Sequence, residues 1–194
     1  MNPDPDLAQM DIGDFEAIIF DFDGTLAPNL DLVEMRRQVM TLSLDAGVPA
    51  EVTRELYIIE IIEASSDWLK TLNPSDGDAF HDRAHQHITD FEMEAAARLE
   101  PFPEVRGMLS ALRERGIRSA VVTRNCEAAV RNTFPDIDEY LDLVLARDNV
   151  AFCKPDPRHL QDALDGLNAR GDAAMMIGDG RLDMELGRSL RLSC

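Results

Sequence analysis

Four short runs of apolar residues alternate with longer amphipathic stretches along the chain. The runs lie at 17–23, 117–123, 141–147 and 173–179, and they are rich in β-branched residues or end in polar side chains. Runs of this kind are typical of strands buried on both faces of a parallel sheet. The stretches between the last three runs, 126–134 and 155–170, have apolar residues at helical spacing. The alternation predicts a doubly wound, Rossmann-like α/β fold, in which ligands bind at the carboxyl ends of the strands.

A much longer interval separates the first two runs, and its apolar residues also recur at helical spacing. We expect three helices there: 31–46, 50–72 and one marked by Phe80, Ala84, Ile88 and Phe91. The segment NPSDGD at 73–78 is expected to be a turn, because it combines Pro, Gly and Asp. The pattern therefore predicts a helical insertion in the α/β core.

The segment behind this insertion sets its boundary. EPFPEV at 100–105 contains two prolines, which suit a stiff hinge. A helix over 103–116 then leads back to the sheet, with Gly116 as its C-cap residue. We expect a core of residues 1–29 and 99–194 and a helical insertion at 30–98.

The composition limits the classes of partner. With 194 residues, 45% of them hydrophobic, the chain can bury a substantial core. Its net charge of −18 opposes binding to nucleic acid or to anionic membranes, since both require a basic footprint. An anionic substrate must therefore be held by local cations, a metal ion or backbone amides.

Further features of the chain indicate its compartment. Its three cysteines lack CxxC spacing, which argues against a disulfide framework or a zinc knuckle and favours a reducing environment. Residues 1–15 lack the basic and apolar regions of a signal peptide, and no apolar run approaches membrane-spanning length. We expect a cytoplasmic protein, either a monomer or a homodimer.

Carboxylates follow the first and the last apolar run. Because side chains alternate along a strand, Asp21 and Asp23 are expected to point the same way, and their repulsion calls for a bound cation or a shared proton. Asp179 and Asp183 follow the fourth run. Four carboxylates at one sheet edge predict a Mg²⁺ site, although each pair alone also fits a strand end or a helix cap.

Two other segments carry groups that suit phosphate. Thr123 and Asn125 flank Arg124 at the end of the second run, where a hydroxyl, an amide and helix N-terminal N–H groups could bind phosphate; plain helix capping is the alternative. Lys154 is one of only two lysines in the chain and precedes a proline-initiated helix. Its ammonium could neutralise phosphate oxygens, whereas a solvated loop lysine is the simpler interpretation.

Taken in order, DFDGTL, the Thr of VVTRN, the Lys of CKPDP and the paired Asp of GDGRLD resemble the four motifs of the haloacid dehalogenase superfamily of phosphatases. The resemblance spans residues 17–190. PFPEVRGMLSALRERGIRSAVVTRN is similar to the segment by which helical-cap members, including the phosphoglycolate phosphatase-like branch, re-enter the core. The insertion at 30–98 has the position of that cap.

The resemblance implies a role for each motif residue. Asp21 would attack phosphorus and form an aspartyl phosphate, and Asp23 would serve as general acid and base. Mg²⁺ would be bound by Asp21, the backbone carbonyl of Asp23 and Asp179, with Asp183 acting through water or behind the direct ligands. Thr123 and Lys154 would hold the phosphoryl oxygens. Asn125 stays a candidate for phosphate binding from its amide and its place beside Thr123 alone.

Several alternatives stay open at this stage. Asp23 favours a phosphatase over a dehalogenase, because ester cleavage must protonate an alkoxide, but a phosphomutase could use the same pair. A catalytically silent phosphate-binding or interaction module is a further alternative. Phosphoglycolate, sugar phosphates and nucleoside monophosphates all remain candidate substrates.

Two final features stand apart from the motifs. His81 and His85 have the i, i+4 spacing that can bind a transition metal, but the sequence offers no convincing third ligand and favours packing or solvated histidines. MELGRSLRLSC, 184–194, stops where members of the superfamily continue into another strand. We expect that strand to be missing or shortened, which would expose the edge of the fourth strand and give one reason to look for a dimer.

Overall fold

The computed structural model describes residues 12–194, which form two compact units. Unit 1 comprises the chain up to Pro28 and Ala96–Cys194, and unit 2 comprises Asn29–Ala95. Residues 1–11 of the expected core, and most of the segment assessed for a signal peptide, lie outside the described residues. Within 12–194, no helix combines the length and the apolar character that crossing a membrane requires.

Unit 1 is built on a parallel sheet of four strands in the order β3-β2-β1-β4. The strands are β1 (Ala17–Phe20), β2 (Arg118–Val122), β3 (Leu143–Leu145) and β4 (Ala174–Ile177). Each lies inside one of the four apolar runs and ends before its polar residues. The predicted α/β fold class is therefore confirmed.

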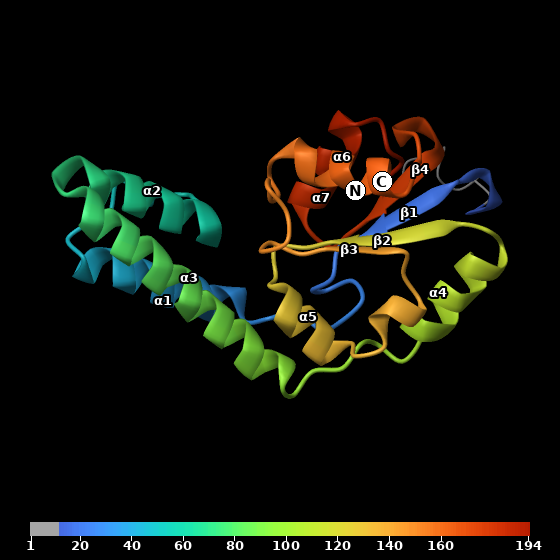
Figure 1. Cartoon of the computed structure of the whole chain (residues 1–194), viewed down its shortest axis with the longest axis horizontal. Helices are drawn as coiled ribbons and strands as arrows, with labels where there is room; N and C mark the ends of the chain where they lie inside the picture. The colour runs from blue at the N-terminus through green and yellow to red at the C-terminus, as the bar shows by residue number, and fades with distance from the viewer. Residues whose placement is uncertain (1–11) are drawn as a thin grey trace. The chain divides into compact units, whose positions relative to one another are not determined.

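Helices cover both faces of the sheet (Figure 1). They are α4 (Val105–Glu114), α5 (Glu127–Thr133), α6 (Pro157–Gly166) and α7 (Arg181–Ser189), and short 3₁₀ turns occur at Ile12–Asp14, Ile137–Glu139 and Gly171–Ala173. Ile18 and Phe20 point into the layer that holds α4 and α5. Ala17 and Ile19 point into the layer that holds α6 and α7. Alternate side chains of one strand thus anchor both layers.

The end of α4 and the end of the chain complete unit 1. Gly116 has φ +75°, the left-handed conformation expected of a glycine after a helix. Beyond α7, Ser193 lies beside β4, where its carbonyl accepts the Met176 N–H (2.8 Å) and its own N–H donates to the Ala174 carbonyl (3.1 Å). Ser193 thereby pairs with part of the outer edge of β4.

Unit 2 consists of three helices, α1 (Leu32–Asp45), α2 (Ile58–Leu72) and α3 (Pro74–Ala96). Their buried side chains include Val39 of α1, Ile61 of α2, and Ala84 and Ile88 of α3. The expected second helix begins eight residues later than 50, since the segment before it is turns and includes Glu55 at φ +60°. A left-handed residue cannot continue a right-handed helix.

The turn expected at 73–78 is wrong, because Pro74–Asp78 form the first part of α3. Proline suits the first helical position, and the Asn73 Oδ1 accepts the Ser75 N–H at 3.2 Å. Gly77 permits a close approach of α2: an added Cβ would lie 2.3 Å from the Lys70 Cγ and 2.7 Å from the Ser66 carbonyl oxygen. The residues that indicated a turn instead start a helix and bring it close to its neighbour.

Candidate active site

The predicted site residues of unit 1 follow the carboxyl ends of its strands. Asp21 comes directly after β1 and Thr123 directly after β2. The Asp21 N–H donates to the Ile177 carbonyl (2.8 Å) and the Thr123 N–H to the Leu145 carbonyl (3.0 Å), so the strand pairing extends one residue past each strand. This pairing holds the start of each motif at the same edge of the sheet.

Lys154 lies at the centre of the charged groups. Its side chain is only 2% exposed, and its Nζ lies 3.0 Å from the Asp21 Oδ1 and 2.7 Å from the Asp183 Oδ1. Lysine is almost never buried unless it is paired. Burial lowers the pKa of Lys154, but the two carboxylates outweigh burial and raise it above its usual value. Lys154 is therefore an ammonium that bridges two acidic side chains, and not a solvated loop lysine.

A buried histidine holds the loop that carries Lys154. The Lys154 N–H donates to the His159 Nδ1 at 3.0 Å, and the His159 Nε2 lies 3.2 Å from the Leu145 carbonyl oxygen. This pairing assigns the ring proton to Nε2. Burial, together with the Lys154 ammonium, lowers the pKa of His159 to about 4, so that the ring is neutral. His159 was not among the site residues predicted from the sequence, although a histidine in the first turn of the helix after Lys154 is a usable signal.

Asp183 is fixed from both sides. Its Oδ1 accepts from Lys154, and its Oδ2 accepts the Gly180 N–H at 3.2 Å. The backbone of Gly178 passes so close that an added Cβ would lie 2.5 Å from the Asp183 Oδ2. The glycines of GDGRLD thus make room for the carboxylate that holds Lys154.

Three carboxylates offer oxygen ligands at one place. Asp21, Asp179 and Asp183 each present an oxygen within 4.8 Å of the others. An all-oxygen donor set of this kind suits a hard divalent cation such as Mg²⁺. Burial raises the pKa of Asp21 to about 6, with Lys154 opposing the rise and Asp183 adding to it. The donor set therefore fits the expected metal, and a cation there would offset the excess negative charge.

Asp23 has a different partner from Asp21. The Asn125 Nδ2 lies 3.2 Å from both carboxylate oxygens of Asp23. The Asn125 N–H donates to the Thr123 Oγ1 at 3.1 Å, which ties the amide to the end of β2. Asp21 and Asp23 were expected to point the same way because side chains alternate along a strand. β1 ends at Phe20, however, so both aspartates lie beyond the strand and this alternation does not set their directions. Asn125, predicted to assist phosphate binding, orients the Asp23 carboxylate.

The start of α5 is less open than expected. The Glu127 N–H donates to the Asp148 Oδ1 at 2.8 Å, and the Asn125 N–H is already paired with Thr123. Two of the backbone N–H groups that the sequence offered for phosphate are thus used within the protein. By contrast, the buried Asn125 Oδ1 and Thr25 Oγ1 have no hydrogen-bond partner among the described residues.

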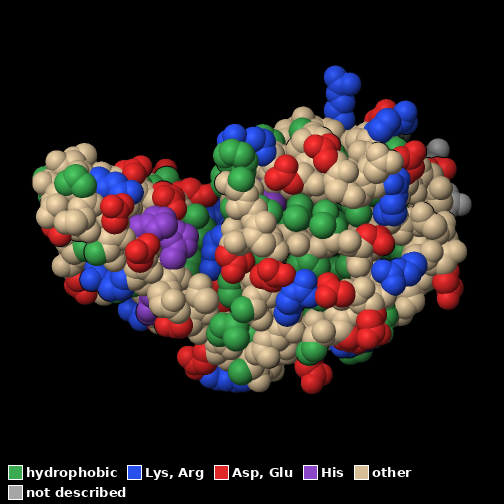
Figure 2. Space-filling view, in the orientation of Figure 1, with side chains coloured by type: hydrophobic (Ala, Val, Ile, Leu, Met, Phe, Trp, Pro, Cys, Tyr) green, Lys and Arg blue, Asp and Glu red, His purple; other side chains and the backbone are tan. Residues whose placement is uncertain are grey.

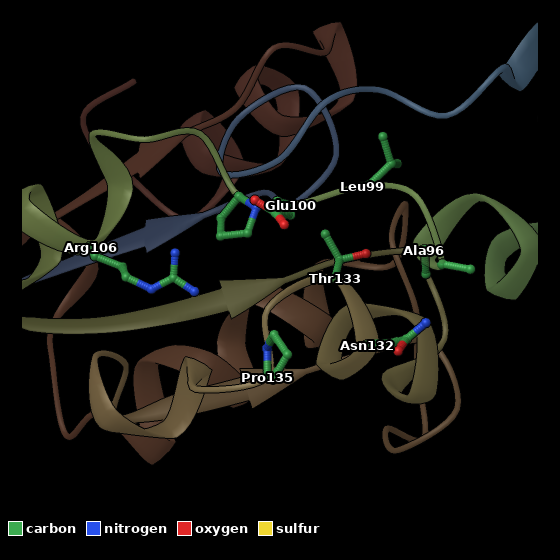
Figure 3. A pocket seen from close by; sticks show the side chains of 9 residues that line it. Ala96, Leu99, Glu100, Arg106, Asn132, Thr133 and Pro135 are labelled. Atoms are coloured by element: carbon green, nitrogen blue, oxygen red, sulfur yellow. The ribbon is translucent and has the colours of Figure 1, made fainter.

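A separate pocket of about 400 Å³ lies elsewhere in unit 1 (Figure 3). It is lined by the segment from Ala96 to Arg106 and by the end of α5, including Asn132 and Thr133, and none of its lining residues is a predicted site residue. Arg106 makes a two-pronged ion pair with Asp136, at 2.6 and 2.8 Å. The charge of this arginine is therefore engaged within the protein.

Comparison with known proteins identifies relatives over most of the chain. A family model described as haloacid dehalogenase-like hydrolase matches residues 15–190. Pyrophosphatase PpaX of Halalkalibacterium halodurans is 26% identical over 180 residues, which cover 91% of this chain and 80% of the relative. Phosphoglycolate phosphatase of Rhodospirillum rubrum is 27% identical over 183 residues, covering 90% and 76% respectively.

Solved structures give the same result. The crystal structure of CbbY from Rhodobacter sphaeroides in complex with xylulose-(1,5)bisphosphate superimposes with a TM-score of 0.60 and 25% sequence identity. The superposition covers 93% of this chain and 84% of CbbY. The likeness in fold thus covers most of this chain.

Proposed function

This chain belongs to the haloacid dehalogenase-like hydrolase family, and on that premise we propose that it is a Mg²⁺-dependent phosphatase acting on a small phosphorylated metabolite. One observation carries the proposal: the buried Lys154 ammonium bridges Asp21 and Asp183 beside a group of three carboxylates. Perturbed, mutually dependent charges at the carboxyl ends of parallel strands are typical of active sites. The phosphatase names of the curated relatives support the same reaction class.

In the proposed reaction, Asp21 is the nucleophile. Its carboxylate oxygen forms a bond to phosphorus, the bond from phosphorus to the ester oxygen breaks, and an aspartyl phosphate results. Water then attacks the same phosphorus, which releases inorganic phosphate and restores the Asp21 carboxylate. Splitting the hydrolysis in this way requires a carboxylate held in place, and the Phe22 N–H (2.7 Å) and Lys154 (3.0 Å) both bind the Asp21 Oδ1.

Asp23 is the proposed acid and base. It gives a proton to the leaving alkoxide in the first step and takes one from the attacking water in the second. The Asn125 amide at 3.2 Å fixes the orientation of the Asp23 carboxylate for both transfers.

Asp21, Asp179, Asp183 and the backbone carbonyl of Asp23 are the residues that we propose hold Mg²⁺. When bound, the ion would offset the repulsion between the carboxylates and the phosphate and would orient the phosphoryl group. Asp183 also fixes Lys154 at 2.7 Å. Lys154, with the Thr123 hydroxyl, is proposed to neutralise the phosphoryl oxygens.

The test is hydrolysis of para-nitrophenyl phosphate with Mg²⁺ and with EDTA. We expect turnover only with Mg²⁺, and a loss of roughly 10⁴-fold or more in Asp21→Asn, because the nucleophile is removed. Asp172→Asn is the matched control, since Asp172 is an exposed residue of unit 1 paired with Arg170. Turnover retained in Asp21→Asn would refute the mechanism, and no metal-dependent turnover in the native chain would favour a silent phosphate-binding module.

The choice of substrate is a separate proposal. Residues 30–98, the predicted helical cap, are proposed to select the substrate, because they are inserted between the two strands that Asp21 and Thr123 directly follow. A panel of phosphorylated metabolites that includes phosphoglycolate, pyrophosphate and sugar bisphosphates would rank the classes. Appearance of a transferred phosphate in place of free phosphate would identify a mutase. The cytoplasmic location and the monomeric or dimeric state remain predictions.

A further inference from the structure

Two histidines of α3 and one glutamate of α2 meet on the surface of unit 2. The His81 Nε2 lies 3.2 Å and the His85 Nε2 lies 3.3 Å from the same oxygen, Glu63 Oε1. The two imidazole rings are tilted by 50°, with their centres 4.4 Å apart. Figure 2 shows histidine side chains gathered on the visible face of this unit. Three potential ligands from two helices therefore converge.

The packing of α2 against α3 creates this arrangement. The two helices are joined at Asn73 and run antiparallel, so Gly77 contacts Ser66 near the joint and His81 meets Glu63 further along. The i, i+4 spacing places both histidines on the face that α2 covers. Glu63 is 18 residues before His81, which explains why the sequence offered no third ligand.

We propose that Glu63, His81 and His85 bind a divalent transition-metal ion of the Zn²⁺ class. Two imidazoles and one carboxylate suit Zn²⁺, Co²⁺ or Ni²⁺, whereas Mg²⁺ prefers oxygen ligands alone. Metal bonds of 2.0 to 2.2 Å at tetrahedral angles put neighbouring ligand atoms roughly 3.3 Å apart. The distances from Glu63 Oε1 to the two imidazole nitrogens, 3.2 and 3.3 Å, agree with this spacing. All three ligand atoms lie within 4.8 Å of one another, so a shift of about an ångström or two would close the set around the ion.

Solvent access and an outer partner also suit such a site. The side chains of Glu63, His81 and His85 are 51%, 35% and 27% exposed, so an ion can enter and water can fill the remaining coordination position. The His81 Nδ1 lies 3.5 Å from the Asp82 Oδ1, so Nδ1–H would donate towards this carboxylate once Nε2 binds metal. Metal-bound histidines usually have a partner of this kind. The ion would link α2 to α3.

The first experiment measures Zn²⁺ binding by calorimetry to the full chain without a histidine tag. Excess Mg²⁺ is present throughout, to occupy the separate group formed by Asp21, Asp179 and Asp183. We expect one equivalent of Zn²⁺ to bind the native chain and no binding at this site in the double variant His81→Gln/His85→Gln. Loss of a residue that only supports a metal ligand typically weakens metal binding by about tenfold or more. Glu63→Gln removes a proposed direct ligand, so it should weaken Zn²⁺ binding by more than about tenfold.

His87→Gln is the matched control. His87 lies on the same helix, but its Nε2 contacts the Gln38 Oε1 at 2.7 Å and not Glu63. This variant should bind Zn²⁺ as the native chain does. All variants keep the three cysteines, so any Zn²⁺ bound by thiols would still be measured in the double variant.

A second measurement separates coordination from general attraction of cations. Co²⁺ bound at the site should give the intense visible absorption of a tetrahedral complex in the native chain and in His87→Gln, and not in the double variant. Zn²⁺ should also raise the melting temperature of the native chain and of His87→Gln, and leave that of the double variant unchanged. Circular dichroism of the metal-free double variant and of Glu63→Gln shows whether each is folded.

The proposal is overturned if the native chain binds no Zn²⁺ in excess Mg²⁺, or binds it equally after both histidines are replaced. Should the double variant fail to fold, the Co²⁺ spectrum of Glu63→Gln decides, since an unchanged spectrum would exclude the carboxylate as a ligand. None of these measurements depends on phosphatase activity. Failure of the proposed reaction would therefore leave this result standing, and the reverse also holds.

Discussion

Unit 1 and unit 2 each bring together a cluster of titratable side chains, and the two clusters differ in burial. In unit 1, the side chains of Lys154 and Asp183 are 2% and 3% exposed. In unit 2, Glu63 is 51% exposed and His81 is 35% exposed. Buried charges depend on one another, because removing one leaves another without compensation, whereas water screens exposed charges. The same kind of substitution should therefore have very different effects in the two places.

The largest difference should come from the only two lysines of the chain. Lys154→Met leaves Asp21 and Asp183 buried without their cation, which should lower the free energy of unfolding by about 3 to 5 kcal/mol. Lys70 is 39% exposed and pairs with Asp78 at 3.2 Å, so Lys70→Met should cost less than about 1 kcal/mol. Urea unfolding of both variants measures the difference. Equal losses would contradict the contrast between the clusters.

His159 should make the buried cluster sensitive to acid. The pKa of His159 is about 4 in the folded chain, against an ordinary value of 6.5 for histidine, so between pH 4 and 6.5 the unfolded chain binds a proton that the folded chain does not. The stability that depends on neutral His159 is present above pH 6.5 and is lost as the pH falls towards 4, by about 3 kcal/mol. His159→Gln lacks this titration.

The measurement for this prediction is urea unfolding of the native chain and of His159→Gln at several pH values from 7 to 4. The free energy of unfolding of the native chain should fall relative to that of His159→Gln as the pH is lowered from 7 to 4. A difference that stays constant over this range would show that His159 does not titrate as expected.

When no metal is bound, Asp21 should change the stability of the protein with pH in the opposite sense to His159. Burial raises the pKa of Asp21 to about 6, from an ordinary value of 3.8. The stability linked to protonated Asp21 is therefore present below pH 3.8 and is lost as the pH rises through 6, by about 3 kcal/mol. In EDTA, Asp21→Asn should gain in stability relative to the native chain as the pH rises from 4 to 7.

Thermal unfolding in EDTA and in Mg²⁺ tests this prediction. Mg²⁺ should narrow the difference in melting temperature between Asp21→Asn and the native chain, because the cation stabilises the native carboxylates. An Asp21→Asn variant that is less stable than the native chain at pH 7 in EDTA would argue against an excess of negative charge in the site.

The smallest effect is expected in the exposed cluster. Without transition metal, Glu63→Gln should change the free energy of unfolding by less than about 1 kcal/mol, since solvent screens the interaction of Glu63 with His81 and His85. Urea unfolding of Glu63→Gln and of the native chain in the presence of a chelator measures this change. A loss as large as that of Lys154→Met would erase the distinction between the two clusters.

The same contrast explains what the sequence could predict. The family and the α/β fold class are confirmed. Asp21, Thr123, Lys154 and Asp179 follow strands of one parallel sheet, so topology alone brings their segments to one edge. The roles of these residues remain proposals, but their neighbourhood followed from the order of the strands.

Other features depend on packing that no local pattern encodes. Glu63 joins His81 and His85 only because α2 packs antiparallel to α3. Gly77 indicated a turn by composition, although its lack of a side chain serves close helix packing. The hydrogen bond between Asn125 and Asp23 likewise joins residues 102 positions apart. Such contacts become visible only once the elements are placed in space.

The scarcity of lysine gives the chain a built-in chemical reporter. An amine-reactive reagent can reach the Lys70 side chain directly, whereas Lys154 is enclosed between two carboxylates. Acylation of Lys154 must therefore wait for the site to open, and its rate relative to that of Lys70 would report how often it does. Mass spectrometry of the two labelled peptides would follow this opening in the unmodified sequence, with no engineered probe.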